Sequence, residues 1–188
     1  MDGQVVHSWS FEHTPGLWGQ LLPNGNLLYA GNLRSGPEGL VGGVGGEVLE
    51  VDWDGNVVWS YEDVNLHHDV SRAPNGNTVV LGWEPVRPVI ASQVRGGFVG
   101  TELDGVLWSD YLNEISPDGA IVWEWHAQDV LDPFQDAICP LHERHEWTHA
   151  NACTALPDGN ILVSFRMLNT IGIVDRQTGG FLWKYTNI

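Results

Sequence analysis

Residues 147–185 decide the fold of this chain, and they read WTHANACTALPDGNILVSFRMLNTIGIVDRQTGGFLWKY. Within them the turn Pro157-Asp158-Gly159-Asn160 opens an apolar strand that ends at Ser164-Phe165-Arg166. A second strand is predicted at 171–175, and a third after the turn at Thr178-Gly179-Gly180. Asp-Gly supplies the positive φ that tight hairpins require. The stretch therefore predicts short antiparallel strands joined by tight turns.

Most of the chain repeats this plan. Two more turns of the same kind open apolar strands, at 23–29 and 74–80. Each unit then carries a Gly turn with a Trp four residues later, namely Gly55 with Trp59, Gly119 with Trp123, and Gly179 with Trp183. We predict units of four short antiparallel strands at 13–63, 64–129 and 147–188, with a leading strand in residues 1–12.

The fold class predicted from these units is all-β, a β-propeller built of four-stranded antiparallel blades. The Trp after each Gly turn is followed two residues later by a second aromatic residue. These aromatic pairs would pack one blade against the next. A propeller needs about four to eight blades to close, so roughly three units predict one partial propeller domain over 1–188, an open arc. A plain open array of sheets is the alternative. Insertions are expected at 84–110 and 126–146, the second with a helical turn.

Charge limits the possible partners. The formal net charge is −16, which argues against nucleic acid and anionic membrane surfaces as partners. A small anionic substrate remains possible, because repulsion between charges is screened beyond about 10 Å at ordinary salt. A local cation would then have to capture it.

Compartment and oligomeric state stay open. No apolar run approaches the ~20 residues of a membrane-spanning helix, and no signal peptide is recognised at the start of the sequence. The two cysteines, Cys139 and Cys153, could pair, but two cysteines alone do not imply a disulfide.

A histidine precedes the turn of every unit, as His13, the pair His67-His68, and His149. If the units are blades, the same strand of each lines the central channel, and we expect these histidines to converge there. The alternative is a structural role within each strand. His13 is the weakest member, because two extra residues separate it from its turn.

Arg166 closes an otherwise apolar strand. One interpretation is an ion pair with a nearby acid such as Asp175. The other is an anion clamp, because the planar guanidinium fork matches the oxygens of sulfate, phosphate or carboxylate.

One group of residues contains several side chains of the kinds that bind metal ions. The group consists of His126, His142, His145 and His149, with Cys139 and Glu146. It lies in a predicted loop and matches no spacing with a firm coordination geometry, so no metal site is predicted.

Three short segments resemble the bacterial arylsulfotransferase family. They are His67-His68-Asp69, Trp147-Thr148-His149-Ala150-Asn151 and Ser164-Phe165-Arg166. The opening residues 2–9, followed by 21–26, also resemble the start of that family's propeller domain. The resemblance covers most of the chain.

This resemblance implies a six-bladed propeller with a central active site. Its members move a sulfuryl group from an aryl sulfate to a phenol through a sulfated histidine, without the adenosine-based sulfate donor, and are often exported; no cofactor is therefore expected. Carried over residue by residue, His68, His149 and Arg166 fall on catalytic positions, and His67 and Asn151 on substrate-binding ones. The family's nucleophilic histidine lies further on, and no histidine follows Arg166, so the nucleophile is expected to be missing here.

Two other interpretations remain. Residues 175–183 match the tryptophan-docking repeat of quinoprotein-like propellers, some of which are non-catalytic scaffolds that only bind proteins. A quinone-dependent dehydrogenase would need a cofactor platform and metal ligands, which the sequence does not offer. His149 and Arg166 discriminate, because a scaffold has no need of them in a channel.

Overall fold

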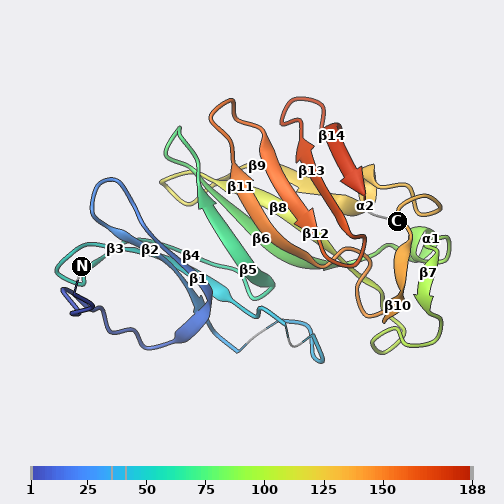
Figure 1. The fold of residues 1–188 in the computed structure, drawn as a ribbon, viewed down its shortest axis with the longest axis horizontal. Coiled ribbons are helices and arrows are strands. Elements are labelled where there is room, and N and C mark those ends of the chain that lie inside the picture. Colours follow the sequence, from blue (N-terminus) through green and yellow to red (C-terminus); the bar gives the residue numbers. More distant parts are fainter. Residues whose placement is uncertain (1, 35, 41, 187–188) are drawn as a thin grey trace.

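The structure is a computed structural model that describes residues 2–34, 36–40 and 42–186. In these ranges the chain is all-β, with three four-stranded antiparallel sheets in sequence order (Figure 1). The first sheet holds β1 (Thr14–Leu21), β2 (Leu27–Asn32), β3 (Gly46–Val51) and β4 (Val57–Glu62). The second holds β5 (Leu66–Arg72), β6 (Thr78–Pro85), β8 (Trp108–Ile115) and β9 (Ile121–His126). The third holds β11 (Ala150–Ala155), β12 (Ile161–Phe165), β13 (Thr170–Val174) and β14 (Phe181–Thr186).

The repeated turn has the same geometry in all three sheets. Gly25, Gly76 and Gly159 have φ of +89°, +89° and +88°, values that glycine adopts without steric cost. In the first two sheets the turn is also tied to the third strand, because its Asn side chains donate hydrogen bonds to Glu50 or Glu114. The turns therefore fix both hairpin register and the approach of the third strand.

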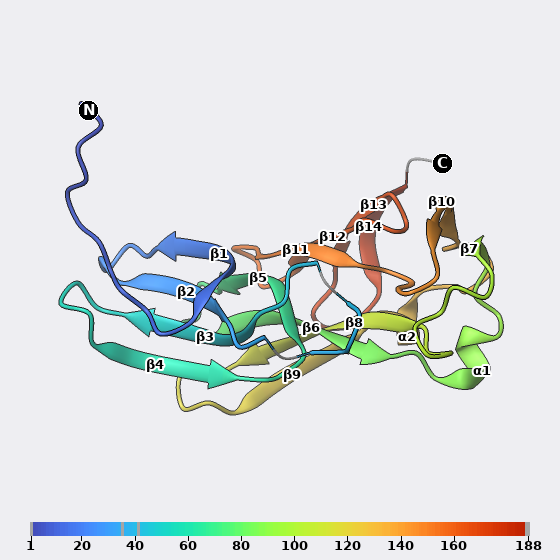
Figure 2. The same cartoon turned by 90° about the horizontal axis from the view of Figure 1, so that it is seen from below.

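The three sheets lie side by side through their first strands. β5 packs against both β1 and β11 without belonging to their ladders. Side chains of β5 reach the backbone of β11, where Asp69 Oδ2 accepts the amide of Cys153 at 2.8 Å and Ser71 Oγ accepts that of Ala155 at 3.0 Å. Viewed from below, the first sheet lies at one end of the molecule and β7 and β10 at the other (Figure 2).

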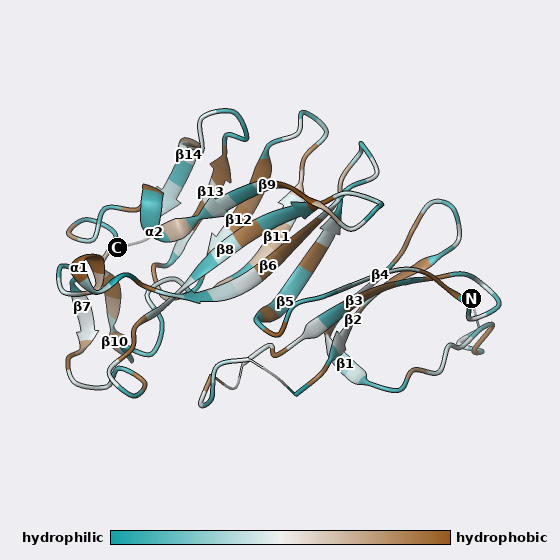
Figure 3. Cartoon of the chain, turned by 180° about the vertical axis from the view of Figure 1, so that it is seen from behind, coloured by the Kyte–Doolittle hydropathy of each residue, from teal (hydrophilic) through white to brown (hydrophobic). Residues whose placement is uncertain are grey.

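The hydrophobic core lies between neighbouring sheets. One cluster joins the second and third sheets and includes Trp147, Phe165 and Leu112, all at most 1% exposed. A smaller cluster joins the first and second sheets around Leu28 and Val70. Hydrophobic segments are visible along β5, β12 and β13 (Figure 3). Because apolar burial is the main favourable term in folding, sheet docking and core formation are one event.

Aromatic side chains of β9 dock on the third sheet. Trp123 Nε1 donates to the carbonyl of Arg176 at 3.0 Å, and Trp125 Nε1 donates to that of Gly179 at 2.8 Å. The corresponding residues of β14, Trp183 and Tyr185, are 47% and 56% exposed. The outer aromatic pair of the third sheet thus has no covering sheet in the described part of the chain.

The two insertions fold against each other. The first contains α1 (Pro88–Ala91) and β7 (Gly96–Phe98), and the second contains α2 (Ala127–Val130), the expected helical turn, and β10 (Ile138–Glu143). β7 and β10 pair in parallel. Arg144 fastens the pair, donating to the carbonyls of Val94 and Gly96 and to Glu102 at 2.6–3.0 Å.

The leading strand predicted in residues 1–12 is wrong for residues 2–12, which form no strand; residue 1 lies outside the described residues. A strand needs a neighbouring backbone ladder, and this segment is held by side chains instead. Trp9 Nε1 donates to the carbonyl of Asp52 at 2.8 Å, and His7 stacks on Trp53. The residues of this segment have a sequence pattern typical of a strand, but no neighbouring strand pairs with them in the described part of the chain.

Cys139 and Cys153 are both free thiols. Among the described residues, no helix has the length and apolar character needed to cross a membrane.

Candidate active site

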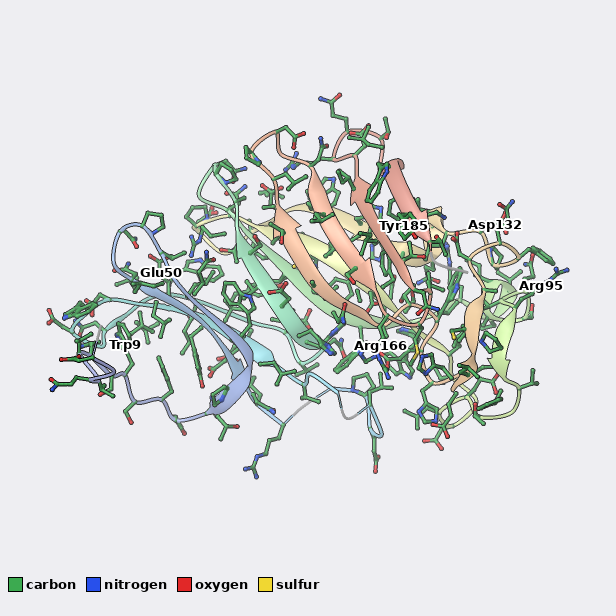
Figure 4. The ribbon with its side chains drawn as sticks, in the orientation of Figure 1. Trp9, Glu50, Arg95, Asp132, Arg166 and Tyr185 are labelled. Carbon is green, nitrogen blue, oxygen red and sulfur yellow. The ribbon has the colours of Figure 1, made fainter. Side chains whose placement is uncertain are left out.

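A cavity of about 510 Å³ opens at the end of β12. Arg166, His149 and Glu146 line one part of it, and the loop between β2 and β3 contributes Leu40 and Gly42. Arg166 lies at the lower end of the third sheet in Figure 4. The cavity is therefore built by segments of the first and third sheets and by both insertions, with Phe98 from the first of them.

His149 in the cavity wall meets His68, and both residues have an unusual backbone conformation. His68 and His149 have φ of +53° and +47°, the left-handed region that residues other than glycine seldom enter and that costs roughly 1–3 kcal/mol. Their rings lie edge to face with centroids 4.8 Å apart. His68 belongs to β5 and His149 immediately precedes β11, so the same place in two neighbouring sheets supplies both rings.

Glu146 orients His149. Its Oε2 lies 2.6 Å from His149 Nδ1, and its Oε1 accepts the indole N–H of Trp83 at 2.7 Å. All three side chains are buried or nearly so. A carboxylate that faces Nδ1 favours the proton there, which leaves the lone pair of a neutral His149 on Nε2.

His67 lies behind His68 and is 3% exposed. Its Nδ1 is 2.9 Å from His68 Nδ1, and its ring stacks on Trp83 with centroids 4.1 Å apart. Its Nε2 lies 2.9 Å from Oδ1 of the fully buried Asp110, a close ion-pair contact that lacks the alignment of a good hydrogen bond. The other oxygen of Asp110 accepts the amide of Ala150 at 2.7 Å.

The electrostatics of the cluster keep His68 neutral. Burial is the largest cause that lowers its pKa, from 6.5 to about 4. Positive charge on His67, His149 or Arg166 lowers it further, and only Asp110 raises it. At neutral pH the His68 ring is therefore uncharged and keeps one nitrogen lone pair.

Arg166 is an exposed cation without an acidic partner in the described part of the chain. Arg34 and Arg95 also lack one there, whereas the other five basic residues are ion-paired. Asp175, the acid nearest to it in the predicted strand order, instead accepts hydrogen bonds from its own turn. Because acids outnumber bases 24 to 8, an unpaired guanidinium in a cavity wall is available to an anionic ligand.

The backbone ties Arg166 to His149. The amide of Arg166 donates to the carbonyl of His149 at 3.0 Å. On the opposite side, the amide of His68 donates to the carbonyl of Gly43 at 2.7 Å. Gly43 has φ of +75°, and any Cβ there would overlap the His68 ring. A glycine is therefore required for the first sheet to close over the histidines.

The structure brings His67, His68, His149 and Arg166 together. Asn151 is exposed on β11 and is not among the cavity-lining residues. His13 contacts Glu47 at 2.8 Å in the first sheet. Two of the candidate metal ligands have separate carboxylate partners, Glu84 for His126 and Glu143 for His145, and no group of three or more potential ligands occurs among the described residues.

Sequence reasoning missed Asp110 as a site residue and considered Glu146 only as a metal ligand. The sequence offers no specific signal for Asp110, because β8 carries a second carboxylate, Glu114. For Glu146 the signal is its position three residues before His149.

Apolar side chains form the outer rim of the cavity. Phe98 of β7 and Leu141 of β10 line it and are 53% and 79% exposed. Met167 and Leu40 line it as well and are buried. The two insertions thus place an apolar wall beside a cation.

Comparison with known proteins gives one family match. The family model described as Arylsulfotransferase (ASST) matches residues 60–187. No curated protein matches the chain.

Several solved structures show a weak likeness. They include a Bacteroides caccae protein of unknown function (14% identity, TM-score 0.45, covering 89% of this chain and 44% of that one). Virginiamycin B lyase from Staphylococcus aureus is 10% identical with a TM-score of 0.45, and the match covers 89% of this chain and 40% of that one. Kuenenia stuttgartiensis hydrazine synthase is 14% identical with a TM-score of 0.46, and the match covers 85% of this chain and 39% of that one. The chain spans less than half the length of each. The family match over residues 60–187 includes His67, His68, His149 and Arg166, and the chain belongs to the arylsulfotransferase family.

Proposed function

We propose that this chain takes part in transferring a sulfuryl group from an aryl sulfate ester to a phenolic acceptor through a sulfated histidine. Family membership supports a sulfotransferase-type function in general. The observation that carries the proposal is the Arg166 guanidinium, which faces the cavity without an acidic partner among the described residues. A guanidinium fork binds tetrahedral oxyanions through two parallel hydrogen bonds.

His68 and His149 supply the acid–base chemistry in this proposal. Sulfuryl transfer resembles phosphoryl transfer, in which charge spreads over peripheral oxygens and positioning provides most of the catalysis. Arg166 would hold those oxygens, and a neighbouring imidazole would exchange a proton with the phenolic oxygen. The fully buried His67 then serves these rings without touching the substrate, and Asn151 is kept as a substrate-binding candidate on the family resemblance alone.

The aryl group would lie against the apolar rim. Phe98 and Leu141 stand at the mouth of the cavity that Arg166 and His149 line. An aromatic ring on Phe98 would gain stacking and apolar burial. A bound aryl sulfate would thereby direct its anionic end to Arg166 and its ring to the insertions.

The sulfated histidine is proposed to come from outside these 188 residues, from a later part of a six-bladed propeller of which about three blades are present. The family resemblance places that nucleophile well after Arg166, and residues 167–188 contain no histidine. The side-by-side packing of β1, β5 and β11 supports the propeller interpretation, because first strands meet at the centre of such a fold.

A binding experiment tests the anion site first. Isothermal titration with phenyl sulfate should give an affinity that falls tenfold or more in Arg166→Gln, since a charge-assisted hydrogen bond contributes about 1.5–3 kcal/mol. Arg95→Gln is the matched control, because Arg95 also lacks an acidic partner among the described residues but stacks on Phe134 outside the cavity. Equal affinities in both variants would contradict the proposal.

A rescue experiment tests the missing nucleophile. The chain alone should release no p-nitrophenolate from p-nitrophenyl sulfate, whereas added imidazole should accept the sulfuryl group in an Arg166-dependent reaction. Turnover without imidazole would mean that His68 or His149 itself is sulfated. If no p-nitrophenolate is released with or without imidazole, and Arg166→Gln binds phenyl sulfate as tightly as the wild type, the non-catalytic scaffold is favoured.

A further inference from the structure

We propose that Asp110, His67 and His68 form a proton relay, in which His68 takes the proton of the phenolic acceptor at Nε2 while passing its Nδ1 proton to His67. This inference rests on the proposed function, since it names the groups that move the phenolic proton. Asp110 and His67 are positioning residues in this relay, and His68 is the member of the three that contacts the substrate.

The tautomers follow from the contacts in order. The carboxylate of Asp110 lies 2.9 Å from His67 Nε2, so the proton of a neutral His67 belongs on Nε2. Its Nδ1 then carries the lone pair. His67 Nδ1 and His68 Nδ1 are 2.9 Å apart, and two facing lone pairs would repel, so His68 must carry its proton on Nδ1. The lone pair of His68 is left on Nε2, which has no partner among the described residues.

The relay lets His68 act as a base without becoming charged. The phenolic O–H bond breaks as an N–H bond forms at His68 Nε2, and the Nδ1–H bond of His68 breaks as one forms at His67 Nδ1. The phenolic oxygen bonds to sulfur as the bond from sulfur to the nitrogen of the sulfated histidine breaks, and that nitrogen keeps the electron pair. The positive charge ends on His67 beside Asp110, and the reverse sequence protonates a leaving phenolate.

The surroundings give a reason for this arrangement. A cation on His68 is disfavoured first by burial and then by positive charge on His67, His149 and Arg166, so that the pKa of His68 is lowered to about 4. A cation on His67 would instead contact a buried carboxylate and the face of Trp83, both of which stabilise positive charge.

The decisive variant is Asp110→Asn. The buried amide of Ala150 needs an acceptor, and Asp110 Oδ2 provides it at 2.7 Å. An asparagine must therefore direct its oxygen to Ala150 and its NH₂ to His67 Nε2. His67 then becomes protonated on Nδ1, and His68 must carry its proton on Nε2. One substitution reverses both tautomers.

Two-bond ¹H–¹⁵N correlation spectra of the whole chain at neutral pH read these tautomers directly. We expect His67 Nε2–H with His68 Nδ1–H in the wild type, and the opposite pair in Asp110→Asn. Glu47→Gln is the matched control, because it removes a carboxylate that contacts His13 and should leave both tautomers unchanged.

A wild-type His68 protonated on Nε2 would overturn the relay, as would a folded Asp110→Asn variant with unchanged tautomers. If that variant does not fold, the wild-type spectrum decides alone. These spectra are recorded on samples without any sulfate ester, so they do not depend on substrate binding. A chain with the expected tautomers but no Arg166-dependent binding of phenyl sulfate would therefore refute the proposed function while confirming the proton positions on His67 and His68, so the two failures are distinguishable.

Discussion

His68 and His149 meet edge to face with ring centroids 4.8 Å apart, although they belong to different sheets. Each ring is backed by its own carboxylate, His149 by Glu146 directly and His68 by Asp110 through His67. The pair is thus an interface contact as well as a chemical one. Changes that separate the second and third sheets should alter the site before they alter either sheet.

The first prediction concerns the titration of His68. Its ¹H–¹⁵N signals should titrate with a midpoint near 4, far below the ordinary 6.5. Because the folded pKa is the lower one, the unfolded chain binds protons more readily between these values, and this group lowers stability as pH falls from 6.5 toward 4. Arg166→Gln should raise the midpoint by removing a positive charge. A wild-type midpoint near 6.5 would show that the ring is not held as described.

The second prediction concerns the glycine beneath His68. Gly43→Ala should destabilise the protein and displace the ring, because the new Cβ overlaps it at a backbone φ of +75°. Gly25→Ala is the control, with φ of +89° and no atom within 4 Å of the new Cβ, and should cost only the roughly 1–2 kcal/mol of left-handed backbone. Urea denaturation of both variants gives the comparison. Equal losses would mean that the histidine ring yields without cost.

The third prediction separates the aryl group from the sulfate. Phe98→Ala should weaken binding of phenyl sulfate about three- to tenfold, as expected for losing part of the burial of one aromatic side chain. It should leave binding of inorganic sulfate unchanged. Val99→Ala is the neighbouring control, since Val99 is 87% exposed and does not line the cavity. Parallel weakening of both ligands by Phe98→Ala would point to collapse of β7 instead.

The fourth prediction concerns acid stability. Burial alone would raise the pKa of Glu114, but hydrogen bonds from Asn75, Asn77 and Arg176 bring it below its ordinary 4.5. Because the pKa is lower in the folded state, ionised Glu114 stabilises the protein above pH 4.5, and this stabilisation is lost as pH falls through the folded pKa. The gap in unfolding free energy between wild type and Glu114→Gln should therefore be widest above pH 4.5 and shrink below it.

Denaturation at a series of pH values measures this gap. Glu124→Gln on the exposed side of β9 is the control and should show a small gap at every pH. A gap for Glu114→Gln that widened on acidification would reverse the assigned sign.

The strands and turns were predictable because their signals are local. Turns such as Pro157–Asn160 act within a few residues, and β2, β6, β12, β13 and β14 lie where these signals placed strands. The leading strand failed for the complementary reason. Residues 5–9 have a suitable pattern, but pairing needs a partner that pattern alone cannot reveal.

The candidate site was predictable where residues recur and hidden where they do not. His68 and His149 were found because equivalent units carry them at the same place. Asp110 and Glu146 are two among 24 acids, and only their contacts with His67 and His149 in the folded chain distinguish them. Their role depends on contacts between distant parts of the chain, which no short-range pattern records.

The seam between β5 and β11 also governs folding kinetics. Asp69 and Cys153, whose hydrogen bond helps close it, are 84 positions apart in the sequence. Each sheet can form from local hairpins, but this seam requires a long loop to close and adds high contact order to a chain rich in short-range pairs. The histidine cluster should therefore mature in the last kinetic phase, after most of the strand signal in circular dichroism has already developed.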